Sequence, residues 1–345
     1  MKNKIFLTLL ILFLGSFILY PHIQKHILPQ QKNINILCST YPITLITKNV
    51  TQNCPTLHVD TMLPANLGCP HDYMLTPQDM LKLTQADILI INGLGMENFL
   101  QLQELENIPI LDSSQNIPNI LYDDTTPLHL ATHKHIDKKT CVHTHQHIEK
   151  NTCKHIDNNM CKHIHQHINN ANPHLFASPL RAGQIAIQIA EQLSTKYSQY
   201  TTQLQTNAQQ YQNKMNQLHK EWQNAISQLP NKKIITYHNI LDYLAQDTGL
   251  EIITTLQEHT DATASPSEIL QIIQTIQEHN VGAICTEPQY QPTLANTIVQ
   301  ETNILLIQID PVASGPDNPS LDYYITTMQA NIQNILKLQT NRKEK

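Results

Sequence analysis

The stretch TPQDMLKLTQADILIIN, residues 76–92, indicates the fold class of this 345-residue chain. Its first eleven residues predict a helix, because Thr76 can cap it, Pro77 fits its first turn and Asp79 lies near the positive end of the helix dipole. The run DILIIN at 87–92 is short, apolar and rich in isoleucine, which is typical of a strand buried on both faces of a parallel sheet. The stretch therefore predicts a helix followed by a parallel strand, which is the repeating unit of an α/β protein.

The same alternation continues on both sides of this unit. A second helix with a capping serine is predicted at 265–279, SPSEILQIIQTIQEH. Seven further runs have the length and composition of buried strands, at 34–40, 56–63, 108–112, 232–238, 251–256, 281–287 and 304–310. They form two sets, so we predict an α/β protein of two lobes, each a mostly parallel four-stranded sheet flanked by helices.

A long polar stretch separates the two sets of strands. From Ser178 to Gln228 it has no glycine beyond Gly183 and no proline beyond Pro179, and it is rich in Gln, Ala and Leu. It predicts a long linking helix without a gap, stiff enough to limit movement between the lobes. The expected divisions are a leader at 1–32, an N-terminal lobe at 33–177 with a disordered loop at 129–172, linking helices at 178–230 and a C-terminal lobe at 231–345.

Composition narrows the classes of partner. The net charge of -6 argues against nucleic acid, and the aromatic share of 5% with abundant Gln and Asn indicates a polar-surfaced protein. Outside the histidine-rich tract described below, Cys38, Cys54, Cys69 and Cys285 follow no CxxC spacing. A disulfide between Cys54 and Cys69 and two free buried thiols both remain open.

The N-terminus predicts export. Met1-Lys-Asn-Lys4 leads into the apolar run IFLTLLILFLGSFILY at 5–20, which is a signal-peptide pattern. The run is shorter than the roughly twenty residues that span a bilayer comfortably, but no Ala-x-Ala site follows it, so an uncleaved anchor is the alternative. We expect a periplasmic or other extracytoplasmic protein, either released or anchored through this segment.

Residues 133–167 hold nine histidines and three cysteines in a duplicated twenty-residue unit. Polar residues fill the gaps and no apolar period survives, so this tract predicts a flexible loop. Imidazoles two residues apart beside a thiol suit weak capture of Zn²⁺ or Cu⁺, and the alternative is a spacer expanded by replication. The auxiliary ligands would be His133, His135, Cys141, His143, His145, His147, Cys153, His155, Cys161, His163, His165 and His167.

Outside this tract, four candidate ligands stand at, or in loops consistent with, the carboxyl ends of the strands. They are His71, His174, His238 and Asp310, two from each lobe. Open α/β sheets bind ligands at this edge, and three imidazoles with one carboxylate suit tetrahedral Zn²⁺. The alternative for each histidine is an ordinary loop or strand-end residue, and Asp310 before Pro311 could be a turn residue.

Four blocks resemble, in order, the metal-binding solute-binding proteins of ABC importers for zinc and manganese. They are GCPHDYMLTPQDMLKLTQADILIINGLGMENFL from 68, NPHLFASPLRAG from 172, YHNILDYLAQDTGLEI from 237, and IDPVASG from 309 followed by YYITTMQANI. The resemblance implies that His71, His174, His238 and Asp310 bind one metal ion, and a histidine-rich loop is typical of the zinc-binding members. Asn172, where the family often has an acidic residue, Phe176 in place of a common Trp, and Cys69 depart from the pattern.

The resemblance implies a protein that captures Zn²⁺ and delivers it to a membrane permease. A separate ATPase would power import, since this chain has no GxxxxGK[ST] loop. His238 favours zinc, whereas a carboxylate there would suit Mn²⁺. A manganese or other divalent-metal importer component and a metal-binding adhesin are the alternatives. A zinc hydrolase is disfavoured because HExxH is absent, so we expect a monomer without catalytic activity and without a nucleic acid partner.

Overall fold

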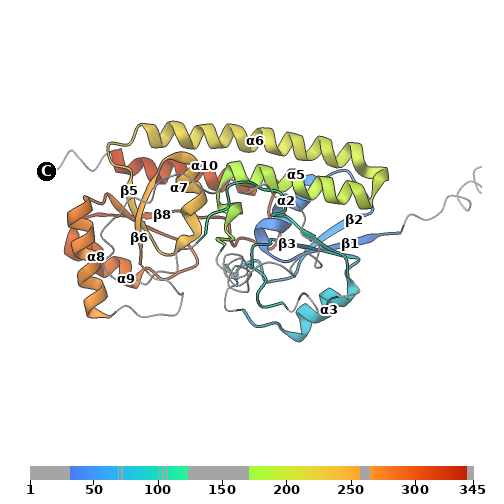
Figure 1. The fold of residues 1–345 in the computed structure, drawn as a ribbon, viewed down its shortest axis with the longest axis horizontal. Helices are drawn as coiled ribbons and strands as arrows, with labels where there is room; N and C mark the ends of the chain where they lie inside the picture. Colours follow the sequence, from blue (N-terminus) through green and yellow to red (C-terminus); the bar gives the residue numbers. More distant parts are fainter. Residues whose placement is uncertain are drawn as a thin grey trace, which may run out of the picture.

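A computed structural model describes residues 32–68, 70, 73–100, 102, 105, 108–122, 171–256 and 265–339. The leader run at 5–20, the histidine-rich tract, Cys69 and His71 lie outside the described residues, so the predictions made for them stay predictions. Two sheets lie side by side beneath a pair of long helices (Figure 1).

Each sheet has four parallel strands, which confirms the predicted fold class. The N-terminal lobe contains β1 (Ile34–Cys38), β2 (Leu57–Thr61), β3 (Ile88–Ile91) and β4 (Ile110–Asp112) in the order β2-β1-β3-β4. The C-terminal lobe contains β5 (Lys233–Thr236), β6 (Glu251–Thr255), β7 (Ala283–Thr286) and β8 (Leu305–Gln308) in the order β6-β5-β7-β8. The two lobes therefore share one topology, and every strand lies within a run predicted from sequence.

Helices cover the faces of both sheets (Figure 1). Thr76 and Ser265 close capping boxes with Asp79 and Glu268, as expected from their sequences. The helices of the N-terminal lobe are α2 (Tyr41–Val50) and α3 (Pro77–Gln85). Those of the C-terminal lobe are α7 (Asp242–Thr248), α8 (Pro266–His279), α9 (Thr293–Thr302) and α10 (Tyr323–Ile335).

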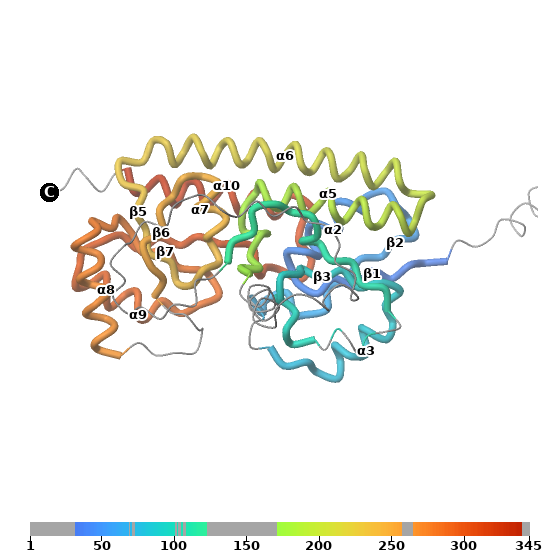
Figure 2. Tube along the Cα trace, viewed as in Figure 1, coloured from blue at the N-terminus to red at the C-terminus, as the bar shows by residue number. Residues whose placement is uncertain are grey.

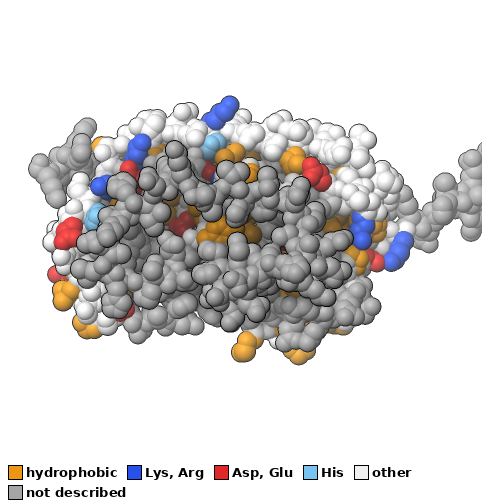
Figure 3. All heavy atoms as spheres, viewed as in Figure 1, with side chains coloured by type: hydrophobic (Ala, Val, Ile, Leu, Met, Phe, Trp, Pro, Cys, Tyr) orange, Lys and Arg blue, Asp and Glu red, His pale blue; other side chains and the backbone are white. Residues whose placement is uncertain are grey.

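The connector between the lobes is a pair of helices, α5 (Pro179–Lys196) and α6 (Thr201–Ser227). The expected long helix is α6, which extends over both lobes (Figure 2), but the expectation of a connector without a gap is wrong. The chain reverses at 197–200, where Tyr and Ser have modest helix propensity and the apolar faces of α5 and α6 can pack on each other. The outer side of α6 presents mostly uncharged polar side chains, which colour the upper edge of the molecule white in Figure 3.

One central core joins the two lobes. It includes Ile36 of β1, Trp222 of α6, Cys285 of β7 and Tyr324 of α10, all almost fully buried. On the face of each sheet that points away from this core lies one smaller apolar cluster. The stable unit is therefore the whole pair of lobes with its connector. None of the helices in the described ranges is long and apolar enough to cross a membrane.

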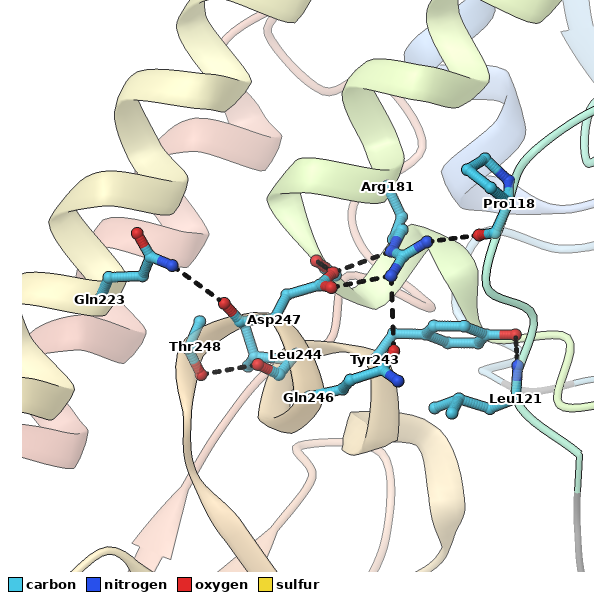
Figure 4. A network of polar contacts seen from close by, with 10 residues as sticks. Pro118, Leu121, Arg181, Gln223, Tyr243, Leu244, Gln246, Asp247 and Thr248 are labelled. Carbon is cyan, nitrogen blue, oxygen red and sulfur yellow. Dashed lines mark hydrogen bonds and ion pairs between the residues drawn. The ribbon is translucent and has the colours of Figure 1, made fainter. Parts of the chain in front are cut away.

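A buried polar network fixes the relative position of the lobes (Figure 4). Arg181 of α5 donates Nε and Nη2 to the two carboxylate oxygens of Asp247 in α7, each at 2.9 Å, and Nη1 to the Pro118 carbonyl at 2.7 Å. Both side chains of the ion pair are 5% exposed. The sequence Ser178-Pro179 is typical of a capped helix start, which predicts that Ser178 caps α5. That prediction is wrong, because the Ser178 hydroxyl donates to Asp247 at 2.7 Å and makes no cap hydrogen bond.

Candidate metal centre

His174 lies fully buried between the lobes, immediately before the short 3-10 helix η3 (Leu175–Ala177). Its imidazole Nδ1 lies 2.9 Å from the side-chain oxygen of Asn172, which also accepts the backbone N–H of His174 at 3.0 Å. The edge of the ring meets Phe176, with centroids 6.0 Å apart. The N-terminal lobe thus supplies one imidazole whose position is set by its own loop.

His238 lies opposite, two residues beyond the end of β5 in the C-terminal lobe. Its ring centroid is 5.5 Å from that of His174, with the planes at 78°. The sequence argument placed these two histidines at one site from different lobes, and the structure brings them together. His238 is 7% exposed, so the pair is largely shielded from water.

Glu287 follows β7 and faces His238. The His238 Nδ1 and Glu287 Oε1 atoms are 2.8 Å apart, and both side chains are buried. The contact is poorly aligned for a hydrogen bond, so neither ring nitrogen of His238 has a hydrogen-bond partner among the described residues. The other carboxylate oxygen of Glu287 accepts from Gln289. Buried polar atoms of this kind are costly unless a ligand satisfies them.

Asp310 lies two residues beyond the end of β8, and hydrogen bonds hold both its backbone and its carboxylate. Its N–H donates to Asn331 Oδ1 at 2.9 Å, and its carboxylate accepts the Val312 N–H at 2.8 Å. Burial raises the pKa of Asp310, the bond from Val312 opposes this, and the nearby charge of Glu287 raises the pKa further. Asp310 and Glu287 are therefore two carboxylates on the C-terminal side of the lobe boundary, close enough for the charge of one to act on the other.

The structure does not place His71, but it does place the loop that leads to it. The Ala65 carbonyl accepts the N–H of Gly315, five residues after Asp310, at 2.9 Å. A Cβ at Gly68 would lie 3.1 Å from Gln289 Cγ, beside Glu287. The described part of this loop thus contacts the C-terminal lobe at Ala65 and at Gly68, three residues before His71.

The described side chains do not complete a metal shell. Within the described ranges, no group of three or more His, Cys, Asp or Glu residues could by itself hold a metal ion. His174 and His238 are therefore a pair of imidazoles that needs further ligands, and His71 is the candidate that the described ranges omit. Cys54 is a buried free thiol, consistent with the second of the two alternatives for the cysteines.

Sequence reasoning missed Glu287. The predicted ligands at strand ends were histidines and the aspartate of the Asp-Pro pair, although the strand predicted at 281–287 already ended on this glutamate. The same topological rule, applied to carboxylates as well as imidazoles, would have found it. The role of Asn172 was also missed, since the sequence shows only an unusual residue and not its contacts.

Two α/β lobes of matching topology, joined by a pair of helices and bringing two buried imidazoles together at their boundary, have the architecture of a two-lobed solute-binding protein. The chain belongs to the ZnuA family, described as zinc-uptake complex component A, periplasmic, whose model matches residues 36–338. Family membership thus agrees with the resemblance seen in the four sequence blocks.

Individual relatives are distant. The zinc-binding lipoprotein AdcA of Streptococcus pneumoniae is 24% identical over 87% of this chain, which spans only 54% of AdcA. The high-affinity zinc uptake system protein ZnuA of Haemophilus ducreyi is 28% identical over 82% of this chain and 86% of its own length. The solved structure of FpvC from Pseudomonas aeruginosa in complex with Mn²⁺ covers 90% of this chain and 99% of its own, with a TM-score of 0.67 at 19% identity, which supports the fold.

Proposed function

We propose that this chain is an extracytoplasmic zinc-binding protein that captures Zn²⁺ and delivers it to the permease of an ABC importer, which a separate ATPase powers. The observation that carries the proposal is the pair of buried imidazoles, His174 and His238, supplied by opposite lobes with centroids 5.5 Å apart. Family membership and the zinc-binding names of its relatives support the same cargo.

In this proposal the tight site consists of His71, His174, His238 and Asp310. Two of these imidazoles lie with ring centroids 5.5 Å apart, and the loop before His71 touches the segments that follow Glu287 and Asp310, which supports this ligand set. Neutral imidazole nitrogens with one carboxylate are the ligands that Zn²⁺ prefers, and Glu287 adds negative charge beside His238. The protein supplies binding and no catalysis.

Release would follow from separating the lobes. Because the ligands come from both lobes, a small relative movement lengthens metal–ligand bonds on one side and lowers the affinity. Docking on the permease would supply that movement, and the Arg181–Asp247 network opposes it in the free protein. Residues 1–32 would direct export or anchor the chain, and the histidine-rich loop would collect zinc weakly beside the tight site.

The test is zinc affinity of the full chain, measured by competition with a chromophoric chelator. His238→Ala should weaken the tight site tenfold or more, because it removes a ligand and admits water. His58→Ala is the matched control, since His58 is an exposed histidine on β2 far from the lobe boundary, and it should leave the affinity unchanged. Equal affinities for wild type and His238→Ala would overturn the proposal.

A further inference from the structure

Asn172 is a fully buried residue whose polar groups all have partners. Its backbone N–H donates to the Leu121 carbonyl at 2.8 Å, and its own carbonyl accepts the Tyr243 hydroxyl at 2.9 Å. Its side-chain Nδ2 donates to the Asn239 carbonyl at 2.9 Å and to Asp242 Oδ2 at 3.1 Å. Asn172 is thus fixed by contacts from both lobes.

These contacts determine which way the amide points. Both partners of Nδ2, the Asn239 carbonyl and the Asp242 carboxylate, are acceptors, whereas the backbone N–H of His174 is a donor that faces Oδ1. A flipped amide would place two acceptors against an oxygen and a donor against an NH₂ group. The atom 2.9 Å from His174 Nδ1 is therefore the carbonyl oxygen.

The orientation of the amide in turn selects the tautomer of His174. A carbonyl oxygen can only accept, so the neutral imidazole carries its proton on Nδ1 and keeps its lone pair on Nε2. Metal-binding histidines commonly donate their other nitrogen to a carboxylate or carbonyl in this way. Here the neutral side-chain amide of Asn172 lies between the carboxylate of Asp242 and the imidazole of His174 and bonds both.

The amide also connects the two imidazoles of the site. Asn239 directly follows His238, and Asp242 begins α7 three residues later. The side chain that orients the N-terminal imidazole is therefore anchored on the segment that carries the C-terminal one. A change in the position of either lobe would disturb the hydrogen bond to His174.

We propose that Asn172 is a positioning residue that holds His174 in its metal-binding tautomer and couples its orientation to the segment of His238, and that Asp242 requires an amide at this position. The proposal rests on the proposed zinc site. It accounts for the asparagine at a position where the family often has an acidic residue. An aspartate would face the Asp242 carboxylate and the Asn239 carbonyl without a donor, whereas the asparagine satisfies both.

The test compares zinc affinity in the full-length wild type, Asn172→Asp, Asp242→Asn and the double variant. Asn172→Asp should weaken the tight site at least tenfold. Asp242→Asn alone should change it less than about threefold, since its side-chain oxygen can still accept from Asn172. The double variant should return to within about threefold of wild type, because the amide introduced at position 242 can donate to the carboxylate introduced at position 172. Unchanged or tighter binding by Asn172→Asp, or no rescue in the double variant, would overturn the proposal.

A spectroscopic measurement separates positioning from folding and needs no variant to bind metal. In ¹⁵N spectra of the metal-free wild type, the ring nitrogens of His174, assigned by their loss in His174→Gln, should show the Nδ1-protonated tautomer. The Nε2-protonated tautomer would overturn the proposal even if all variants fold. Failure of the wild type to bind zinc tightly would instead refute the proposed function, while the tautomer would still report on Asn172.

Discussion

The two lobes share one strand order but use the carboxyl ends of their strands differently. In the N-terminal lobe, Glu97 accepts bonds from the Ser39 hydroxyl at 2.6 Å and from the N–H groups of Asn92 and Gly93 at 2.7 and 3.1 Å. In the C-terminal lobe, Glu287 and His238 leave facing atoms without hydrogen-bond partners among the described residues. Topology selects the edge in both lobes, and an imidazole that faces a carboxylate there without a hydrogen-bond partner in the described part of the chain, as His238 faces Glu287, distinguishes the candidate site from an internal support such as Glu97.

The largest expected effect comes from removing the buried ion pair between Arg181 and Asp247, which holds the two compared lobes in place. Arg181→Met should lower the free energy of unfolding by about 3–5 kcal/mol, because it leaves the buried Asp247 carboxylate without its bidentate partner. Denaturant titration measures the loss. Lys214→Met, which removes an exposed pair with Asp322 at 3.2 Å, is the control and should cost less than about 1 kcal/mol. Similar losses in both variants would show that the network does not hold the lobes.

Glu97 tests the N-terminal side of the comparison. Burial raises its pKa to about 7, although its three donors oppose the shift. The Glu97 carboxyl therefore binds its proton more tightly in the folded protein than in the unfolded chain. The stabilisation that comes from this proton is complete below about pH 4.5 and is lost as the pH rises through 7. The loss amounts to at most about 3 kcal/mol.

Glu97→Gln should remove this part of the pH dependence. Over pH 4.5 to 8, the free energy of unfolding of the wild type should fall more than that of the variant, as measured by denaturant titration at each pH. Zinc affinity at pH 8 should be the same in both proteins. A matching pH dependence, or a loss of zinc binding in the variant, would break the distinction between support and site.

Glu287→Gln tests the C-terminal side with the same chemical change. Loss of the charge 2.8 Å from His238 Nδ1 should weaken zinc binding by about 10- to 100-fold. Calorimetric or chelator-competition titration at pH 8 measures it beside Glu97→Gln. If the two variants bind zinc equally well, carboxylates at the two equivalent edges do not differ in function.

The smallest expected effect comes from deleting residues 133–167. The tight site should change in affinity by less than about twofold, because the two imidazoles that the proposal places in it, His174 and His238, lie outside the deleted segment. The additional weak sites should disappear from the zinc titration. Loss of the tight site on deletion would place the binding centre in the tract and not at the lobe boundary.

The sequence predicted the strands well because a strand buried on both faces must be apolar along its whole length. The runs that contain β3 and β7 are unambiguous in this respect. Helix starts with a complete capping box were equally clear, at Thr76 and Ser265. Ser178 shows the limit of predicting caps from sequence. It is a serine at a cap position, but its hydroxyl bonds the carboxylate of Asp247, which is far away in sequence and which the fold brings close.

Sequence predicted less of the site, because ligand chemistry depends on contacts between distant segments. His174 and His238 were identified and lie together, and Asp310 lies near Glu287. No local pattern shows that Glu287 would face His238 from the end of the neighbouring strand, or that Asn172 would bridge to residues 67 and 70 positions away. The reversal at 197–200 was missed because it requires neither glycine nor proline.

The continuous core also has a consequence for how the chain acquires its structure. Helix α6 packs on both α5 and α10, and α10 is the last α-helix among the described residues. Its side chains Tyr324, Met328 and Ile335 fill the core that also contains Ile36 of the first strand. Folding must therefore wait until nearly the entire chain is available, because contacts of such large sequence separation form late. A chain that ended before α10 would lack the side chains that complete this core.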